Sequence, residues 1–75
     1  MLQFKDQRLV KFGEHVRLLR EKLGLTPGNV AERSYLTKAD LQSIESGNKN
    51  FAFTTLLELS KGLGVSLSEL LKFDL

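Results

Sequence analysis

The segment LTKADLQSIESGN, residues 36–48, carries four polar or small side chains at spacings that place them together if the segment is helical. Positions i, i+1, i+4 and i+5 lie on one side of an α-helix, and Leu41 and Ile44 then lie on the other. The four residues are Lys38, Ala39, Gln42 and Ser43. Their groups can read DNA base edges: lysine favours guanine O6 and N7, glutamine bridges adenine N6 and N7, serine is permissive, and alanine can touch a thymine methyl. The segment predicts a helix with one reading face and one core face.

The remaining side chains give little support to catalytic or metal chemistry. His15 is the only histidine and the chain has no cysteine, so we expect a surface or phosphate-facing imidazole and no metal site. A serine nucleophile would need a base and an orienting acid, and nothing in the sequence pairs His15 with such a serine. The GLG at 62–64 lacks the further glycine and the preceding strand of a nucleotide-binding turn. We therefore expect no enzyme activity, no cofactor and no small-molecule ligand.

Length and charge indicate one small domain spanning residues 1–75. Seventy-five residues are near the lower size at which a single core suffices, and without cysteine its stability must come from apolar packing, as suits a reducing compartment. Residues 1–38 carry eight Lys and Arg against four acids, a net +4, whereas residues 39–75 carry three against five, a net −2. The basic half either faces an acidic polymer or is ordinary solvated helix surface. No apolar run could span a bilayer and the charged N-terminus is unlike a signal peptide, so we expect a cytoplasmic protein.

The N-terminal part of the chain predicts two helices. Apolar residues at 9, 12, 16, 19 and 23 form the stripe of an amphipathic helix that ends at Gly24, with residues 1–11 extending it at the N-terminal side. Thr26 can cap a short second helix whose first position is Pro27, where the missing N–H costs nothing.

A third predicted helix, over about 38–46, pairs with the second. Thr37 followed by Asp40 is a capping pattern at its start, and Gly47 suits a left-handed residue after its end. Only SYLT, residues 34–37, separates the two helices, which forces a steep angle between them, and Ala31 is small enough to let them approach closely. This is helix-turn-helix geometry, in which the outward side of the second helix enters a DNA major groove.

The C-terminal part predicts two more helices after the loop NKNFAF, residues 48–53. Thr54 or Thr55 opens the fourth, which closes near 62–64. Its inward-facing residues are expected to be Leu56, Leu57, Leu59 and Leu63. Ser66 with Glu69 caps a fifth helix over 67–71. Since no segment alternates with period two, the fold class is all-α, with five helices.

Four stretches, taken together, resemble the Cro/CI-type (Xre) helix-turn-helix family of phage repressors and small bacterial regulators. They are RLLREKLGLT at 17–26, VA at 30–31, LQSIESG at 41–47 and LSKGLGVSLSELL at 59–71, and the resemblance covers residues 12–71. It implies a compact five-helix bundle of the lambda repressor-like type, in which the second and third helices form the DNA-reading unit.

The resemblance also assigns roles to three charged residues. Arg20 and Glu45 fall where family members place a partly buried ion pair between the first helix and the end of the third. Arg17 falls where an arginine can reach a DNA phosphate, although a solvated arginine is the alternative.

Some residues depart from the family pattern. Pro27 stands where most relatives have a glutamine that contacts phosphate, and Tyr35 stands where a left-handed glycine is usual, so we expect a reshaped turn. Asp40 would repel phosphate unless it caps the helix or accepts from cytosine N4. Phe51 replaces a proline that often follows this loop, and we expect Phe53 to pack into the core.

Contacts to the DNA backbone are expected from the start of the second helix, the cap of the third and the loop that follows it. Free N–H groups at a helix start and polar side chains in a loop suit phosphate binding, although the loop can also be merely polar surface. The candidate residues are Thr26, Asn29, Thr37, Ser46, Asn48, Lys49 and Asn50.

These features predict a small sequence-specific regulator, in a bacterial or phage-derived setting, that binds double-stranded DNA as a homodimer on an inverted-repeat operator, as a repressor. Dimerisation is expected through the last helix and its flanks, with Phe73 and Leu75 as contacts, unless Phe73 folds back on the core. The alternative is a helix-turn-helix protein-interaction module, or the antitoxin partner of a toxin, with weak DNA binding.

Overall fold

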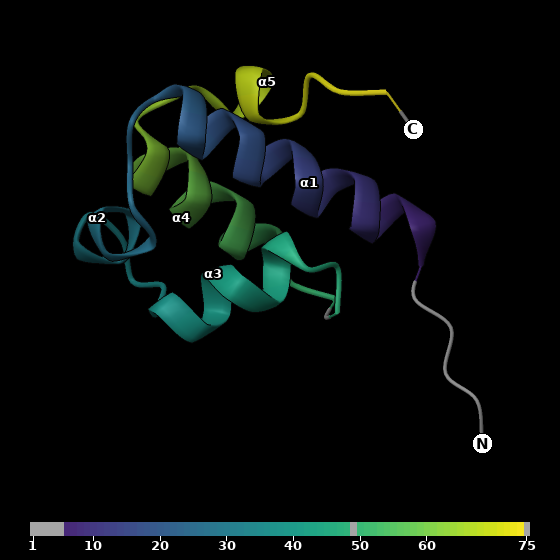
Figure 1. Ribbon diagram of the computed structural model, residues 1–75, viewed down its shortest axis with the longest axis horizontal. Helices are drawn as coiled ribbons and strands as arrows, with labels where there is room; N and C mark the ends of the chain where they lie inside the picture. Colours follow the sequence, from purple (N-terminus) through teal and green to yellow (C-terminus); the bar gives the residue numbers. More distant parts are fainter. Residues whose placement is uncertain (1–5, 49, 75) are drawn as a thin grey trace.

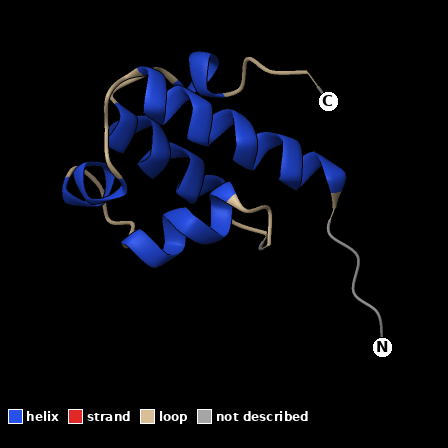
Figure 2. Cartoon of the chain, viewed as in Figure 1, coloured by secondary structure: helices blue, strands red, loops and turns tan. Residues whose placement is uncertain are grey.

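The computed structural model describes residues 6–48 and 50–74, and every regular element in that part of the chain is a helix, as Figure 2 shows. In chain order the helices are α1 (Gln7–Lys22), α2 (Pro27–Glu32), α3 (Lys38–Glu45), α4 (Phe53–Leu63) and α5 (Leu67–Leu70). The predicted all-α class with five helices is confirmed. The expectations for residues 1–5, Lys49 and Leu75 lie outside the described residues.

The helix starts follow local side-chain chemistry in four of these five helices. Asp6, Thr26, Thr37 and Ser66 each accept a hydrogen bond from an amide in the first turn of the helix that follows. Such caps satisfy N–H groups that have no partner within the helix. The three caps predicted at residues 26, 37 and 66 are therefore present.

Three helices end on a glycine with positive φ. Gly24, Gly47 and Gly64 have φ values of 72°, 72° and 75°. After α3, the Gly47 amide donates to the Ile44 carbonyl and the Asn48 amide to the Ser43 carbonyl. This is the Schellman arrangement, in which a left-handed residue lets the chain cap the last carbonyls of its helix. The left-handed role predicted for Gly47 is confirmed.

The start of α4 differs from the prediction. The helix begins at Phe53 after the N-cap Ala52, with no side-chain cap, so neither Thr54 nor Thr55 opens it. The ring of Phe51 packs against Phe12 with centroids 5.4 Å apart. The residue that precedes Ala52 is thus held by apolar packing just before α4 begins.

Eight apolar side chains form the buried core. They are Phe12, Val16, Val30, Leu41, Ile44, Leu59, Leu63 and Leu70. Two expectations for α4 are wrong: Leu57 is 45% exposed and Phe53 is 61% exposed. At about 100° per residue, Leu57 lies about 200° around the helix from Leu59, so both cannot face the core. Phe53 is four residues before Leu57 and shares its outward side.

Two glycines permit the closest approaches between helices. In Figure 1, α1 runs along the bundle above α4 and α3, while α2 stands at one end. A Cβ on Gly13 of α1 would collide with the Ile44 carbonyl oxygen and lie 2.7 Å from that of Glu45. A Cβ on Gly62 of α4 would lie 2.9 Å from the Val30 carbonyl oxygen in α2. Only glycine permits these contacts, which fix α3 against α1 and α4 against α2.

The segment after α5 folds back over α1. The ring of Phe73 lies 5.4 Å from that of Phe12 and stacks on His15 at 5.2 Å with an interplanar angle of 19°. Of the two roles considered for Phe73, the structure shows packing on its own core. His15 is half-buried and its Nε2 is buried, so the imidazole is only partly at the surface, where a surface or phosphate-facing side chain was expected.

Candidate nucleic-acid interface

Helix α3 presents the expected face to solvent. Lys38, Ala39 and Gln42 are exposed and Ser43 is half-buried. On the opposite side of α3, Leu41 and Ile44 are part of the core. The structure therefore places the four candidate reading residues together on the outer surface of α3.

A reciprocal capping box forms the start of α3. The Thr37 amide donates to Asp40 Oδ2 at 3.0 Å, and the Asp40 amide donates to Thr37 Oγ1 at 3.0 Å. Of the two roles considered for Asp40, the structure shows the cap. A carboxylate in the first turn also interacts favourably with the positive end of the helix dipole. The Thr37 hydroxyl serves as an acceptor here, so its hydrogen is still available to a phosphate.

The start of α2 offers fewer free amides than expected. The Thr26 amide donates to Asn29 Oδ1 at 2.9 Å, and the Asn29 amide donates to Thr26 Oγ1 at 3.1 Å. Pro27 has no N–H, so of residues 26–29 only the Gly28 amide is left to bind an anion. The Lys38 side chain lies close to Gly28: a Cβ added to this glycine would be 3.2 Å from Lys38 Cε. Lys38, a base-reading candidate, thus lies beside the one amide of residues 26–29 that is left to bind an anion.

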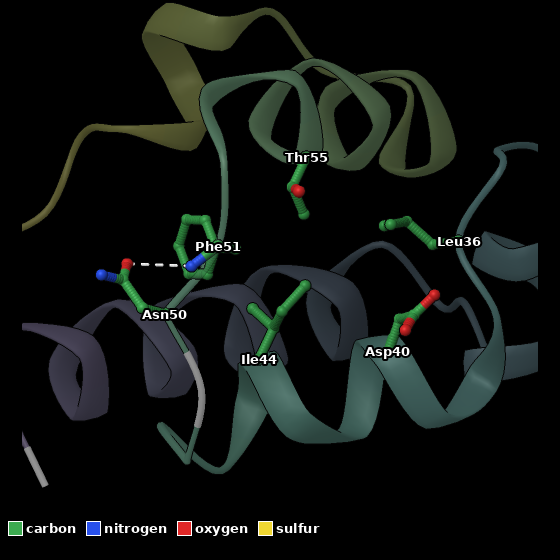
Figure 3. Close-up of a pocket in the computed structure, with 6 residues that line it drawn as sticks. All are labelled: Leu36, Asp40, Ile44, Asn50, Phe51 and Thr55. Atoms are coloured by element: carbon green, nitrogen blue, oxygen red, sulfur yellow. Dashed lines mark hydrogen bonds between the residues drawn. The ribbon is translucent and has the colours of Figure 1, made fainter.

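The loop after α3 contains partly engaged polar groups. Ser46 Oγ donates to the Ser43 carbonyl at 3.1 Å, and the Phe51 amide donates to Asn50 Oδ1 at 2.9 Å. The side-chain nitrogen of Asn50 points away from the cavity in Figure 3. Asn48 is exposed. The side chain of Asn48 and the side-chain nitrogen of Asn50 are therefore the donors of this loop that are better placed to bind a DNA phosphate.

A small cavity lies between α3, this loop and α4. It measures about 210 Å³. Figure 3 shows the six residues that line it: Leu36, Asp40, Ile44, Asn50, Phe51 and Thr55. The cavity is on the α4 side of α3, so it is separate from the outward reading face.

A bidentate ion pair holds the other end of α3 to α1. Arg20 Nε donates to Glu45 Oε2 at 2.7 Å and Arg20 Nη2 to Glu45 Oε1 at 3.1 Å. A third nitrogen of Arg20 donates to the Leu25 carbonyl at 2.9 Å. The two side chains are only 11% and 10% exposed. The hydrogen bonds to Glu45 raise the pKa of Arg20 above its ordinary value, so the guanidinium stays charged.

Arg17 can bind a phosphate only if it leaves an exposed ion pair with Glu21. Its Nη1 lies 3.1 Å from Glu21 Oε1, one turn along α1, and both side chains are about half exposed. Pairs of this kind are weak in water, so the guanidinium can exchange partners readily.

The turn between α2 and α3 has the reshaped form expected from Tyr35. No described residue other than glycine has positive φ. Ser34 Oγ donates to the Val30 carbonyl at 2.8 Å and accepts the Leu36 amide at 3.2 Å. The Tyr35 amide donates to Glu58 Oε1 of α4 at 2.9 Å. The sequence analysis did not predict the roles of Ser34 and Glu58 in this turn. Ser34 could have been recognised as a turn-forming residue, but no local pattern identifies Glu58.

No group of three or more His, Cys, Asp or Glu side chains suited to a metal occurs among the residues that the structure describes. None of the described helices is both long enough and apolar enough to cross a membrane.

Comparison with known proteins identifies the class. A family model described as "Helix-turn-helix domain" matches residues 11–73. The chain therefore belongs to the helix-turn-helix family of DNA-binding transcriptional regulators, which are not enzymes. The resemblance inferred from residues 12–71 is confirmed.

Particular relatives narrow the class further. The chain is 43% identical, over 65 residues, to an uncharacterised HTH-type transcriptional regulator, y4dJ, of Sinorhizobium fredii; the match covers 87% of this chain and 83% of that protein. The fold of this chain is similar to that of the restriction-modification controller protein C.AhdI of Aeromonas hydrophila. The two chains are 32% identical, with a TM-score of 0.81, and the match covers 87% of this chain and 98% of that one. It is also similar to the controller protein C.Esp1396I, solved as a tetramer with its natural 35 base-pair operator, with 28% identity and a TM-score of 0.72 over 85% and 95% of the two chains.

Proposed function

We propose that this chain is a sequence-specific transcriptional regulator of the restriction-modification controller type, which reads double-stranded DNA with the outer face of α3. The observation that supports this most directly is the division of α3 into a buried side, Leu41 and Ile44, and an outer side of uncommitted polar groups. A helix held this way, directly after a short turn, has the form that enters a major groove.

Within this proposal, Lys38 and Gln42 supply the specific hydrogen bonds, and Ala39 and Ser43 supply close contact. Each good bidentate contact is worth about 1 to 3 kcal/mol of discrimination between bases. The backbone contacts come from Arg17, the Gly28 amide, Thr37, Asn48, Lys49 and Asn50. In the free protein Thr26, Asn29 and Ser46 already use groups internally, so we give them a smaller part.

We further propose that the chain acts as a homodimer on an inverted repeat and represses transcription there. One copy makes too few contacts for tight specific binding, whereas two copies about 34 Å apart reach successive major grooves. The assembly of C.Esp1396I as a tetramer on its operator supports multimeric binding. Of the residues expected at the dimer contact, Phe73 packs on its own core, and Leu75 lies outside the described residues. A regulator of this kind acts in the compartment that holds the DNA, the bacterial cytoplasm.

Pro27, Tyr35 and Asp40 are the residues that favour the alternative function, binding a protein partner such as a toxin, because the first two depart from the family pattern and the third carries a negative charge. The structure gives Asp40 a role in the α3 cap, which accounts for a carboxylate on this helix without a protein partner. Salt dependence separates the two functions: neutralising several phosphates makes DNA affinity fall steeply between about 50 and 200 mM salt.

The experiment that tests the proposal is selection of bound fragments from a random duplex library at about 150 mM salt, a physiological ionic strength. Enrichment of an inverted repeat with half-sites near one helical turn apart is expected. If the folded protein enriches no sequence, the proposal is wrong and partner binding becomes the better account.

A further inference from the structure

The turn between α2 and α3 is tied to α4 by a hydrogen bond between distant parts of the chain. The exposed amide of Tyr35 donates to Glu58 Oε1 at 2.9 Å, across 23 residues of sequence. The Tyr35 ring is 86% exposed, and Lys61 Nζ lies 5.0 Å from its centroid. Neither the carboxylate nor the ammonium is needed to fill the core, so their placement at the turn calls for another explanation.

Three residues of α4 meet this turn from one side of the helix. Glu58, Lys61 and Gly62 are spaced i, i+3 and i+4, which places them on a common face. A Cβ on Gly62 would lie 3.3 Å from Ser34 Cβ, so the backbone of α4 lies directly against the turn. Helix α4 therefore supports the turn with its backbone, one hydrogen-bond acceptor and one cation.

The two ends of α3 are held in different ways. Its C-terminal end is fixed to α1 by the Arg20–Glu45 pair and by the close approach at Gly13. Its N-terminal end, which carries Lys38 and Ala39, is positioned through the turn. A change in the turn would therefore shift that end relative to the rest of α3, which Leu41 and Ile44 anchor in the core.

We propose that Glu58 is a positioning residue for DNA recognition: by holding the Tyr35 amide, it sets the direction of the N-terminal half of α3. Glu58 replaces, with a side chain from α4, the support that a left-handed glycine would give this turn locally. This inference rests on the function proposed above for α3, because Glu58 acts on DNA only through the residues that α3 presents.

The direction in which operator affinity changes when Glu58 is replaced makes the inference testable. Removing a negative charge from a DNA-binding protein should strengthen binding, because the phosphates repel it. Loss of positioning should weaken specific binding, because only a fraction of the α3 orientations then fit the groove. We expect Glu58→Ala to weaken binding to the selected operator about tenfold. This is the loss that results when the fraction of molecules with α3 oriented to fit the groove falls to about a tenth. Glu58→Gln keeps the carbonyl acceptor and should stay within about twofold of the parent.

The matched control is Glu14→Ala, which removes an equal charge from an exposed position on α1, away from the turn. Its operator affinity should be unchanged or slightly higher. Thermal unfolding of all variants shows that each is folded. Equal affinities for the parent and Glu58→Ala, or equal losses in Glu58→Ala and Glu58→Gln, would overturn the positioning role.

A measurement without DNA separates this inference from the proposed function. Residual dipolar couplings of amides in the free protein report the direction of α3 relative to α1 and α4. In Glu58→Ala the couplings of residues 38–41 should change while those of α1 and α4 stay the same; in Glu58→Gln none should change. If the parent protein binds no duplex, the proposed function is wrong. The couplings alone then decide whether Glu58 sets the direction of the N-terminal half of α3. Unchanged couplings in Glu58→Ala overturn that step whatever the DNA result.

Discussion

Replacing Arg20 with alanine should remove much of the stability of this domain. The substitution leaves the Glu45 carboxylate at a site where it is 10% exposed and has lost both of its guanidinium hydrogen bonds. Breaking a buried pair by removing one partner costs about 3 to 5 kcal/mol. A domain of this length has a free energy of unfolding of about 4 to 11 kcal/mol, at roughly 0.05 to 0.15 kcal/mol per residue. At about 4 °C or more per kcal/mol, the midpoint of thermal unfolding should fall by at least about 12 °C.

The assay is urea unfolding followed by circular dichroism at neutral pH, with Arg17→Ala as the control. Arg17 lies on the same helix and pairs with Glu21, but those side chains are 43% and 52% exposed. Its loss should cost about 0.5 kcal/mol or less. Replacing Arg20 and Glu45 together with methionine should cost less than Arg20→Ala, because no charge is then left unpaired. If Arg20→Ala costs no more than Arg17→Ala, the pair is solvated and the reasoning is refuted.

Three other perturbations test separate parts of the structure. Gly13→Ala should destabilise the fold by about 2 to 3 kcal/mol in the same urea assay, because the new methyl group collides with carbonyl oxygens of α3; a cost near zero would mean that α1 and α3 can separate freely. The hydrogen bonds from Arg8 to Asp6 lower the pKa of that carboxyl from 3.8 to about 2, so its contribution to the start of α1 is complete above pH 4 and is lost as the pH falls through 2. Amide exchange in the first turn of α1 between pH 5 and pH 2 checks this, and protection that is already lost at pH 4 would contradict it. Lys38→Ala should weaken binding to the selected operator by about 1 to 3 kcal/mol and relax one base position, whereas Lys49→Ala should weaken binding to all duplexes alike; identical behaviour of the two variants would show that α3 does not read the groove as proposed.

Features encoded within a few residues could be predicted from the sequence. The caps at Thr26, Thr37 and Ser66 and the left-handed Gly47 depend on neighbours at most four positions away, and all four are present. The all-α class follows from the same local signals. The Arg20–Glu45 pair came only from the family resemblance, since its members are 25 residues apart and no local pattern joins them.

Features set by the rotation of one helix against another could not be predicted in this way. Every leucine of α4 was expected to face inward, but the helix has only one core side, so Leu57 is outside. His15 is covered by Phe73, 58 residues later in the chain, and spacing along α1 does not reveal this. The contact between Glu58 and the Tyr35 amide is of the same long-range kind.

The alternation of roles along α3 has a consequence for how such a protein can diverge. Thr37 and Asp40 close the helix start, and Leu41 and Ile44 anchor it in the core, while Lys38, Ala39 and Gln42 contribute to neither task. If the outer face reads DNA as proposed, these three positions can change without loss of the fold. A new operator preference is then accessible by single substitutions in a gene copy whose product remains stable throughout.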